Sequence, residues 1–489
     1  MAEKVRVRFA PSPTGYLHIG GARSALFNYL FARHHEGTFV LRIEDTDRSR
    51  FVEGALKEIY ESLEWLGLHW DEGPQKEGEF GPYMQSQRLD LYKEHARKLL
   101  ESGAAYRCFC TPERLAKVRE EQEKKGCPSG YDRHCRDLPQ DQVEKKLENN
   151  IPYVIRFKIP QGRTVGFEDL IRGYIEYQSD VLDDLVLIKT DGFPTYHMAN
   201  VVDDHDMRIT HVLRGDEWIV STPRHVLLYE AFGWQVPKFA HLPVILSPGG
   251  GKLSKRKGAA SVMDYKRNGY LPEALFNFLS LLGWAPGDDR EKMSKEELIS
   301  AFSLEQVSPK ASVLDEKKLE WMNGLYMAER PAESLAPVVV DAWKEKGWVE
   351  QDTAYTDARV TSIIELMKAR SKKLTDLIDN PFYFFRDPES YDEKAARKNF
   401  KPEAAQYLQE IINVVSELQD FNHDELEKQY RVIAERKEVG AGKLIHPTRL
   451  AVSGVSFGPG LFELLEVLGK ETVLRRLNKA IEFIKGKEA

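Results

Sequence analysis

The sequence has few cysteines and no long apolar segment. It contains four cysteines in 489 residues, and all four lie between Cys108 and Cys135. Cysteines so close together cannot cross-link several domains, and a reducing compartment would keep them as thiols. The N-terminus lacks the apolar core of a signal peptide, and the apolar stretch 271–284 is too short to span a bilayer. We therefore expect a cytoplasmic protein with no membrane partner.

An excess of positive charge is also missing. The formal net charge is -7, from 70 Lys and Arg against 77 Asp and Glu, so the total charge does not indicate a nucleic-acid partner. Local basic clusters at 252–257 and 368–373 could still contact phosphate groups, although solvated faces are the simpler interpretation. With 42% hydrophobic and 30% charged residues, the composition is that of a folded chain long enough for about three domains.

The N-terminal segment alternates strand and helix patterns. Residues 5–9 alternate apolar and basic, and after a turn rich in proline and glycine a helical pattern begins at Gly20. A second strand is expected at 39–43, followed by a helix over 56–66. This β-α-β-α order predicts an α/β fold with a Rossmann-type parallel sheet.

The pattern changes twice further along the chain. A charged helical run follows Pro112, with alternating segments at 154–159 and 174–177, which indicates an inserted α+β module. After about Leu271 the pattern is almost wholly helical. We therefore expect a Rossmann-type domain in two halves, 1–105 and 191–250, an inserted module at 106–190, a further region at 251–330, and all-α C-terminal domains at 331–489.

The segment 9–23, Phe-Ala-Pro-Ser-Pro-Thr-Gly-Tyr-Leu-His-Ile-Gly-Gly-Ala-Arg, lies at the first strand-to-helix junction. Backbone N–H groups at a helix N-terminus are unsatisfied and attract anions, and Gly20 and Gly21 allow a phosphate or adenine to approach the main chain. His18 adds a side-chain donor. Taken alone, His-x-Gly is also explained by a tight turn with a capping histidine.

The segment 251–258, Gly-Lys-Leu-Ser-Lys-Arg-Lys-Gly, places four cations and several small residues in one loop. Such a loop can close over a triphosphate and neutralise charge as pyrophosphate leaves. An exposed basic loop with no ligand is the alternative.

Together, His18-Ile19-Gly20-Gly21 and Lys252-Leu253-Ser254-Lys255-Arg256 resemble, in order and separation, the two signature motifs of class I aminoacyl-tRNA synthetases. Segments 42–47, 191–204 and 212–218 are similar to blocks of the bacterial-type glutamyl-tRNA synthetases. The resemblance implies a ligase that activates L-glutamate with ATP and Mg²⁺ to glutamyl adenylate, releases pyrophosphate, and transfers glutamate to the 3′ end of its tRNA. It also implies that 106–190 binds the acceptor stem, that 251–330 contacts the stem and that 331–489 binds the anticodon. We expect a monomer.

The same resemblance implies the site residues. His18 and Lys255 are the catalytic pair; the positions that contact ATP are His18, Gly20, Gly21, Glu217, Leu253 and Lys255; and those around glutamate are Arg8, Ala10, Ser12, Glu44, Tyr196, Asn200 and Arg214.

The chemistry of free glutamate agrees with this set. Its two carboxylates call for two cations, here Arg8 and Arg214, and its ammonium calls for one anion, here Glu44. The residues alone do not allocate the two arginines between the two carboxylates. No protein base is required, because the substrate carboxylate is ionised near pH 7 and is itself the nucleophile.

The cysteines indicate a structural zinc site in the inserted module. Cys108, Cys110 and Cys135 offer three soft ligands, and some bacterial members of the family carry Cys-x-Cys followed by Cys-x-His at this spacing. Asp137 occupies the place of that histidine, so the preferred set is Cys108, Cys110, Cys135 and Asp137. Cys127 or His134 could replace Asp137, and a metal-free cluster of buried thiols is the other possibility.

Three other functions are compatible with parts of this pattern. A glutaminyl-tRNA synthetase is disfavoured because Arg214 suits a carboxylate better than an amide, and because that enzyme carries β-barrels where this sequence is helical. A small nucleotidyltransferase would not need the C-terminal third. A non-catalytic RNA-binding paralogue would not need His18 or Lys255, and both are present.

Overall fold

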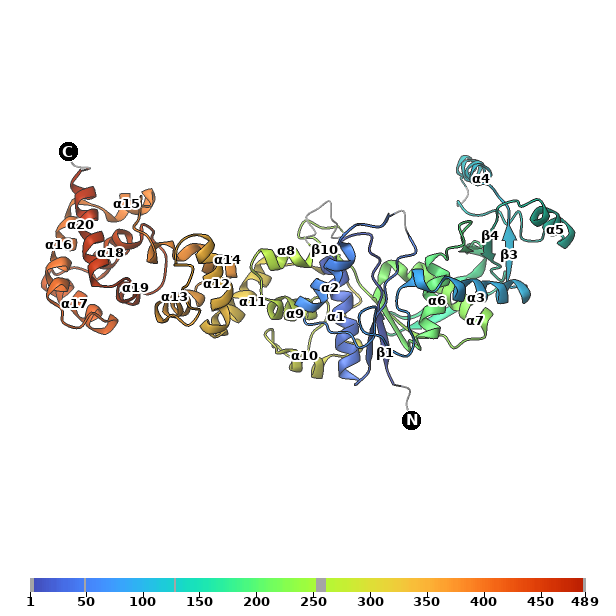
Figure 1. Cartoon of the computed structure of the whole chain (residues 1–489), viewed down its shortest axis with the longest axis horizontal. Coiled ribbons are helices and arrows are strands. Elements are labelled where there is room, and N and C mark those ends of the chain that lie inside the picture. Colours follow the sequence, from blue (N-terminus) through green and yellow to red (C-terminus); the bar gives the residue numbers. More distant parts are fainter. Residues whose placement is uncertain (1–3, 48–49, 127–128, 252–260, 487–489) are drawn as a thin grey trace. The chain divides into compact units, whose positions relative to one another are not determined.

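The computed structural model describes residues 4–47, 50–126, 129–251 and 261–486. The chain forms two compact units, each described here by itself (Figure 1). The first comprises residues 1–265 and 275–315, and the second comprises residues 266–274 and 316–489. The segment 251–330 thus contributes to both units.

The first unit begins with the predicted alternation of strands and helices. Strand β1 (Arg6–Phe9) pairs in parallel with β2 (Thr38–Leu41), and α1 (Ile19–His34) connects them. β2 is buried along its whole length, as expected for a strand covered on both faces. Two helices follow, α2 (Ala55–Trp65) and α3 (Leu89–Glu101).

The second half of the parallel sheet lies beside β1. Strand β8 (His211–Gly215) pairs in parallel with β9 (Lys238–Leu242), and the Thr210 N–H, just before β8, donates to the Arg6 carbonyl (3.0 Å). Helix α6 (Tyr196–Asp206) precedes β8, and helix α7 (Thr222–Phe232) lies between β8 and β9 in the sequence. The carboxyl ends of β1, β8 and β9 therefore meet at one edge, where open α/β sheets bind ligands.

The inserted segment is α+β, as predicted. Its antiparallel sheet has the order β3-β4-β7, and helices without a buried residue, α4 and α5, precede β4. Its hairpin, β5–β6, leaves this module and joins the sheet of β8 and β9, because Asp169 at the end of β5 pairs in parallel with Phe239 of β9. The sequence did not predict this junction. The bounds are β3 Ala105–Cys108, α4 Pro112–Lys124, α5 Gln140–Glu148, β4 Val154–Phe157, β5 Thr164–Asp169, β6 Gly173–Gln178 and β7 Val186–Ile188.

Strand β10 (Ile245–Leu246) pairs in parallel with β11 (Ser312–Val313), and β11 lies in a part of the chain for which the sequence predicts mainly helix. Two residues are too few to show a period of two, so the pattern could not reveal them. The helices of this region are α8 Val262–Arg267, α9 Pro272–Ser280 and α10 Lys295–Ala301.

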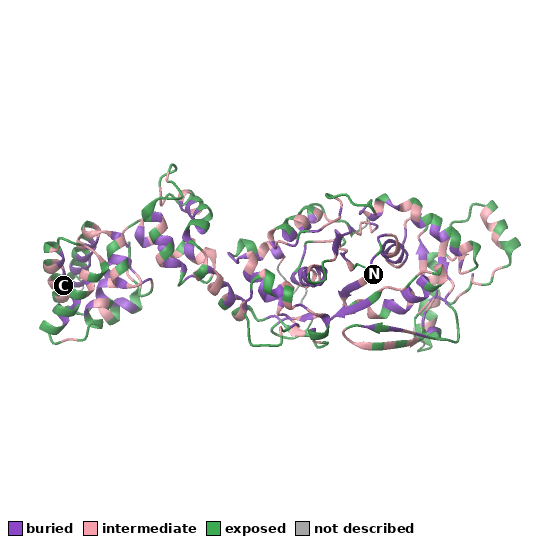
Figure 2. Ribbon diagram, turned by 90° about the horizontal axis from the view of Figure 1, so that it is seen from below, coloured by how far each residue is buried: buried purple, intermediate pink, exposed green. Residues whose placement is uncertain are grey.

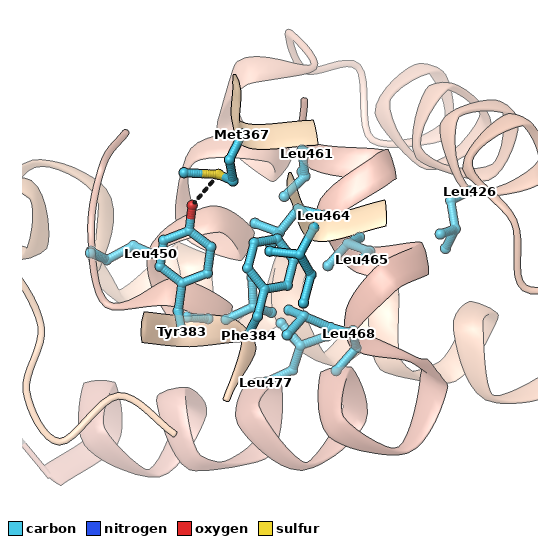
Figure 3. Close-up of a cluster of buried hydrophobic side chains, with 14 of the residues drawn as sticks. Met367, Tyr383, Phe384, Leu426, Leu450, Leu461, Leu464, Leu465, Leu468 and Leu477 are labelled. Atoms are coloured by element: carbon cyan, nitrogen blue, oxygen red, sulfur yellow. Dashed lines mark hydrogen bonds between the residues drawn. The ribbon is translucent and has the colours of Figure 1, made fainter. Parts of the chain in front are cut away.

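The second unit is helical, in agreement with the sequence. Its buried leucines and aromatic residues form one core, part of which Figure 3 shows; the Tyr383 hydroxyl donates to the Met367 sulfur (3.3 Å). Its helices are α11 Glu316–Glu329, α12 Ala332–Glu345, α13 Ala358–Lys368, α14 Leu374–Asp379, α15 Glu393–Asn399, α16 Pro402–Glu417, α17 His423–Arg436, α18 Gly442–Ser453, α19 Leu461–Leu468 and α20 Lys470–Gly486.

The buried residues lie in the interior of each unit. Figure 2 shows buried residues concentrated on the central strands and on the inward faces of the helices. Within the described residues, no helix is both long enough and apolar enough to cross a membrane.

Candidate active site

A cavity of about 210 Å³ opens at the carboxyl ends of β1 and β8, where the parallel sheet predicts a ligand site. Most of the residues that the sequence analysis assigned to ATP and glutamate line it: Arg8, Ala10, His18, Gly20, Gly21, Glu44, Tyr196, Asn200, Arg214 and Glu217. Ser12 is exposed and is not among the residues that line the cavity. Leu253 and Lys255 lie outside the described residues.

His18 caps the helix that begins at this cavity. It is the N-cap of α1, and its Nδ1 accepts from the Gly21 N–H (3.3 Å), so in the neutral ring the proton sits on Nε2. A Cβ on Gly20 would lie 3.0 Å from the His18 ring, and one on Gly21 would lie 2.8 Å from Leu17 Cδ1. Glycine at these two positions therefore keeps the capped helix N-terminus open to an anion.

Arg8 is held by a buried carboxylate. Its Nε and Nη2 donate to Asp204 (3.0 and 3.3 Å), and Arg42 Nη1 donates to the same carboxylate (2.6 Å). All three side chains are almost wholly buried. Burial acts to raise the pKa of Asp204, but Arg42 and Arg8 outweigh it and hold this pKa below its usual value. The charge of Arg8 is therefore already offset within the protein.

Glu44 lies at the border of the same cluster. Its carboxylate accepts from Arg42 Nη2 (3.1 Å), and burial raises its pKa despite that partner. The amide of Asn200 lies alongside, and with its oxygen turned towards the arginines it accepts from Arg42 Nη2 (3.0 Å) and Arg8 Nη2 (3.3 Å). This arrangement presents a carboxylate and an amide to one wall of the cavity.

Arg214 is a buried cation among neutral groups. It donates from Nη2 to the Thr222 hydroxyl (2.8 Å), from Nη1 to the Tyr196 hydroxyl (3.1 Å), and from Nε to His241 Nε2 (3.1 Å). His225 Nδ1 lies 3.4 Å from Nη1. Among the residues that the structure describes, no carboxylate oxygen lies within 4.0 Å of this guanidinium. A buried charge without a counterion is costly, so the site favours an anionic ligand.

Several residues of the site have no assigned role in the sequence analysis. Arg23, on the cavity wall, is buried and bonds to the carbonyls of Leu282 and Pro243, and burial lowers its pKa to about 10. The Trp218 ring packs on Tyr196 with centroids 4.2 Å apart. Asp204 and Trp218 lie inside the segments that carry the family resemblance, which is the signal that could have identified them.

The inserted module brings three thiols together. Cys108, Cys110 and Cys135 have sulfur atoms within 4.8 Å of one another, with Cys110 and Cys135 3.6 Å apart. The hydrogen bond with Cys135 is the main reason that the pKa of Cys108 falls, while that of Cys135 rises. Three converging thiols are a donor set that suits zinc.

The fourth predicted ligand lies apart from this cluster. The Asp137 carboxylate accepts from Lys158 Nζ (3.0 Å), its side chain is 80% exposed, and it is not part of the group of converging donors. A carboxylate that points into water and pairs with a lysine is not positioned as a ligand. His134 is exposed and is likewise outside the group, and Cys127 lies outside the described residues.

Comparisons with known proteins identify the family of this chain. A family described as "tRNA synthetases class I (E and Q), catalytic domain" matches residues 4–321, and an "Anticodon binding domain" family matches residues 332–481. Proteins named glutamate–tRNA ligase from Moorella thermoacetica and Chlorobaculum parvum are 48% and 46% identical; the first alignment covers 99% of both chains, and the second covers 100% of this chain and 99% of the relative.

Solved structures are similar over almost the whole chain. A glutamate tRNA ligase from Elizabethkingia meningosepticum, crystallised with its amino acid, has a TM-score of 0.91 at 43% identity and covers 98% of this chain and 99% of its own. A glutamate-tRNA synthetase from Elizabethkingia anophelis has a TM-score of 0.89 at 42% identity and covers 98% of this chain and 100% of its own. The cavity joins a capped helix N-terminus to two buried arginines and a carboxylate. The family match and the full-length relatives show that the chain belongs to the class I tRNA synthetases of the glutamate and glutamine type.

Proposed function

We propose that the protein is a glutamate–tRNA ligase that activates L-glutamate with ATP and esterifies it to the 3′ end of its tRNA. The observation that carries this assignment is Arg214, a buried cation on the cavity wall with only neutral partners among the described residues. Its electrostatic requirement is met by a second carboxylate on the substrate, which glutamate has and glutamine lacks.

The remaining groups suit the rest of the amino acid. The charge of Arg8 is offset by Asp204, so Arg214 is the stronger attractor for the side-chain carboxylate. The Glu44 carboxylate supplies the anion for the substrate ammonium, and Tyr196 and Asn200 orient the molecule through neutral polar groups. This leaves the reacting carboxylate to face the end of the cavity formed by His18.

Activation requires alignment and charge stabilisation rather than a protein base. The substrate carboxylate attacks the α-phosphorus of ATP, and the N-terminus of α1 with His18 Nε2–H stabilises the phosphate oxygens. Gly20 and Gly21 admit the nucleotide, and Glu217 lies on the same wall. Mg²⁺ accompanies ATP and supplies countercharge to its phosphates. Leu253 and Lys255, outside the described residues, complete the proposed ATP set on the evidence of the sequence motif.

A glutaminyl enzyme is the second candidate, because the matching family includes both specificities. The neutral environment of Arg214 argues against it: with an amide substrate, the buried guanidinium would have no carboxylate partner among the residues that the structure describes. The full-length relatives named above carry the glutamate name.

The tRNA partner follows from the same assignment. We propose that the inserted module, 106–190, binds the acceptor stem, that 251–330 contacts the stem, and that the helical segment 331–489 binds the anticodon, in keeping with the anticodon-domain match at 332–481. We further propose that the enzyme works as a monomer in the cytoplasm.

We also propose that Cys108, Cys110 and Cys135 hold one structural zinc ion in the inserted module. The support is the convergence of three sulfur atoms within 4.8 Å. Zinc at such a site would brace the module, and a closed tetrahedral site would leave no position for catalytic water.

Zinc should be found at about one ion per chain when the protein is purified without chelator and analysed by mass spectrometry of metals. Cys108→Ser should lower that content strongly, because a hydroxyl is a poor zinc ligand. Asp137→Asn should leave it unchanged, because Asp137 pairs with Lys158 instead. A similar loss of zinc in Cys127→Ser would identify Cys127 as the fourth ligand. Substoichiometric zinc in the parent protein, with stability unaffected by a strong chelator, would rule the site out.

Charging of tRNA tests the proposed function as a whole. Purified protein with ATP, Mg²⁺ and glutamate-accepting tRNA should attach glutamate to the tRNA, and glutamine should not replace it. The attached amino acid is identified after alkaline hydrolysis of the ester.

A further inference from the structure

A buried Asp–His pair lies behind Arg214, on the strands next to it in the sheet. Asp169 ends β5, His241 is on β9, and Arg214 is on β8; these strands are neighbours in the order β5-β9-β8. Asp169 Oδ2 is 2.6 Å from His241 Nδ1, and Arg214 Nε donates to His241 Nε2 (3.1 Å). Both members of the pair are buried, at 2% and 0% exposure. Neither residue is among those that line the cavity.

Asp169 is fixed as a carboxylate by four N–H groups. Its Oδ1 accepts from the Ile171 and Arg172 backbone (3.0 Å each), and its Oδ2 accepts from the His241 backbone (3.1 Å) and ring. Although burial acts to raise the pKa of Asp169, these contacts hold it below its usual value. An ionised acceptor requires the proton on His241 Nδ1.

His241 is thereby presented to Arg214 as an acceptor. Burial lowers the pKa of His241 in spite of Asp169, so the ring is neutral at pH 7 and its Nε2 carries a lone pair. With the opposite tautomer, Nε2–H would face the Arg214 Nε–H, and two donors would oppose each other. The pair thus determines whether the guanidinium is held or repelled.

We propose that Asp169 and His241 are positioning residues for amino-acid selection, which fix the orientation of Arg214 and stabilise its charge through a neutral imidazole. The inference rests on the proposed role of Arg214. Asp169 acts on Arg214 only through the His241 ring, which lies between them. Because its carboxylate does not pair with the guanidinium, it does not cancel the attraction of Arg214 for a substrate carboxylate. Thr222, whose hydroxyl lies 3.2 Å from His241 Nε2, accepts from Nη2 and so holds the same edge of the guanidinium.

A purely structural role is the alternative, because Asp169 also caps the turn between β5 and β6 through Ile171 and Arg172. Two substitutions of His241 separate the readings. His241→Gln can place an amide oxygen near the position of Nε2 and accept from Arg214. His241→Asn reaches only the Asp169 side of the ring and leaves Arg214 Nε without its acceptor.

The test measures charging by the full-length protein with glutamate and glutamine. His241→Asn should raise KM for glutamate about tenfold or more and weaken discrimination against glutamine, with KM for ATP nearly unchanged. His241→Gln should recover most of the loss. His211→Asn is the matched control. His211 is on β8, the strand of Arg214, but it contacts Thr210 and does not line the cavity, so KM for glutamate should not change.

Arg214→Cys in the same assay distinguishes failure of the positioning role from failure of the proposed function. If Arg214→Cys impairs glutamate use and both His241 variants match the parent, the positioning role is wrong and the proposed function stands. Equal losses in His241→Asn and His241→Gln, with KM for ATP and the melting temperature affected in parallel, would show a structural role only and overturn the inference. If Arg214→Cys itself retains selectivity, the proposed function fails first.

Discussion

Arg214→Cys is expected to lower kcat/KM for glutamate about a thousandfold. Removing one partner of a buried charged pair costs roughly 4 kcal/mol, which corresponds to about three decades in rate. The lost group is a buried cation whose described neighbours within hydrogen-bonding distance are all neutral, so its charge is available to a substrate carboxylate. Discrimination against glutamine should collapse, because the amide loses no charge-assisted contact. KM for ATP should change little, since the His18 end of the cavity is untouched.

Steady-state charging with both amino acids measures this change. Arg33→Cys is a suitable control: Arg33 pairs with Asp71 at a partly exposed site on the same unit, and it does not line the cavity, so its loss should leave selectivity unaltered. A variant at Arg214 that folds and still prefers glutamate as strongly as the parent would contradict the proposed recognition.

Asp204→Asn should destabilise the α/β unit by about 3–5 kcal/mol, because it leaves Arg8 and Arg42 buried with less countercharge. The folded-state pKa of Asp204 is depressed, so its carboxylate contributes stability at neutral pH, and this contribution is lost as pH falls through the folded value, below 3.8. The difference between parent and variant should therefore be full near pH 7 and should shrink only in strong acid.

Urea unfolding, followed for each unit by its own probe, measures the change. The helical unit should keep its midpoint, since Asp204 belongs to the other unit. Glu230→Gln is the control: the pair of Glu230 with Arg163 is about 40% exposed on both sides, and an exposed pair contributes only about 0–1 kcal/mol. A loss at Asp204 no larger than at Glu230 would show that the buried cluster does not stabilise this unit.

The sequence predicts best what depends on neighbours in the chain. The helix that begins at Ile19 follows from a turn, a capping residue and helical periodicity within one short segment, and the structure confirms it. The same is true of β1 and β2, whose patterns are complete within four residues each. The joint presence of two distant motifs then points to the family, which the relatives confirm.

Contacts between residues that are far apart in the sequence cannot be predicted from local patterns. Arg8 and Asp204 are 196 residues apart, and only the fold brings them together. From the sequence pattern, the hairpin that carries Asp169 is part of the inserted module. In the structure it extends the sheet of β8 and β9, which brings Asp169 next to His241. Asp137 illustrates the opposite case: its spacing from Cys135 matches a ligand position, but its side chain turns to Lys158.

The most direct test of the central claim is the amino acid that this protein attaches to tRNA. Purified protein is incubated with ATP, Mg²⁺, unfractionated tRNA and an equimolar mixture of glutamate and glutamine, and the ester-linked amino acid is released and identified. The buried Arg214 guanidinium, with no carboxylate partner among the described residues, predicts glutamate almost exclusively. Recovery of glutamine as the main product, or tRNA without any attached amino acid, would contradict the account.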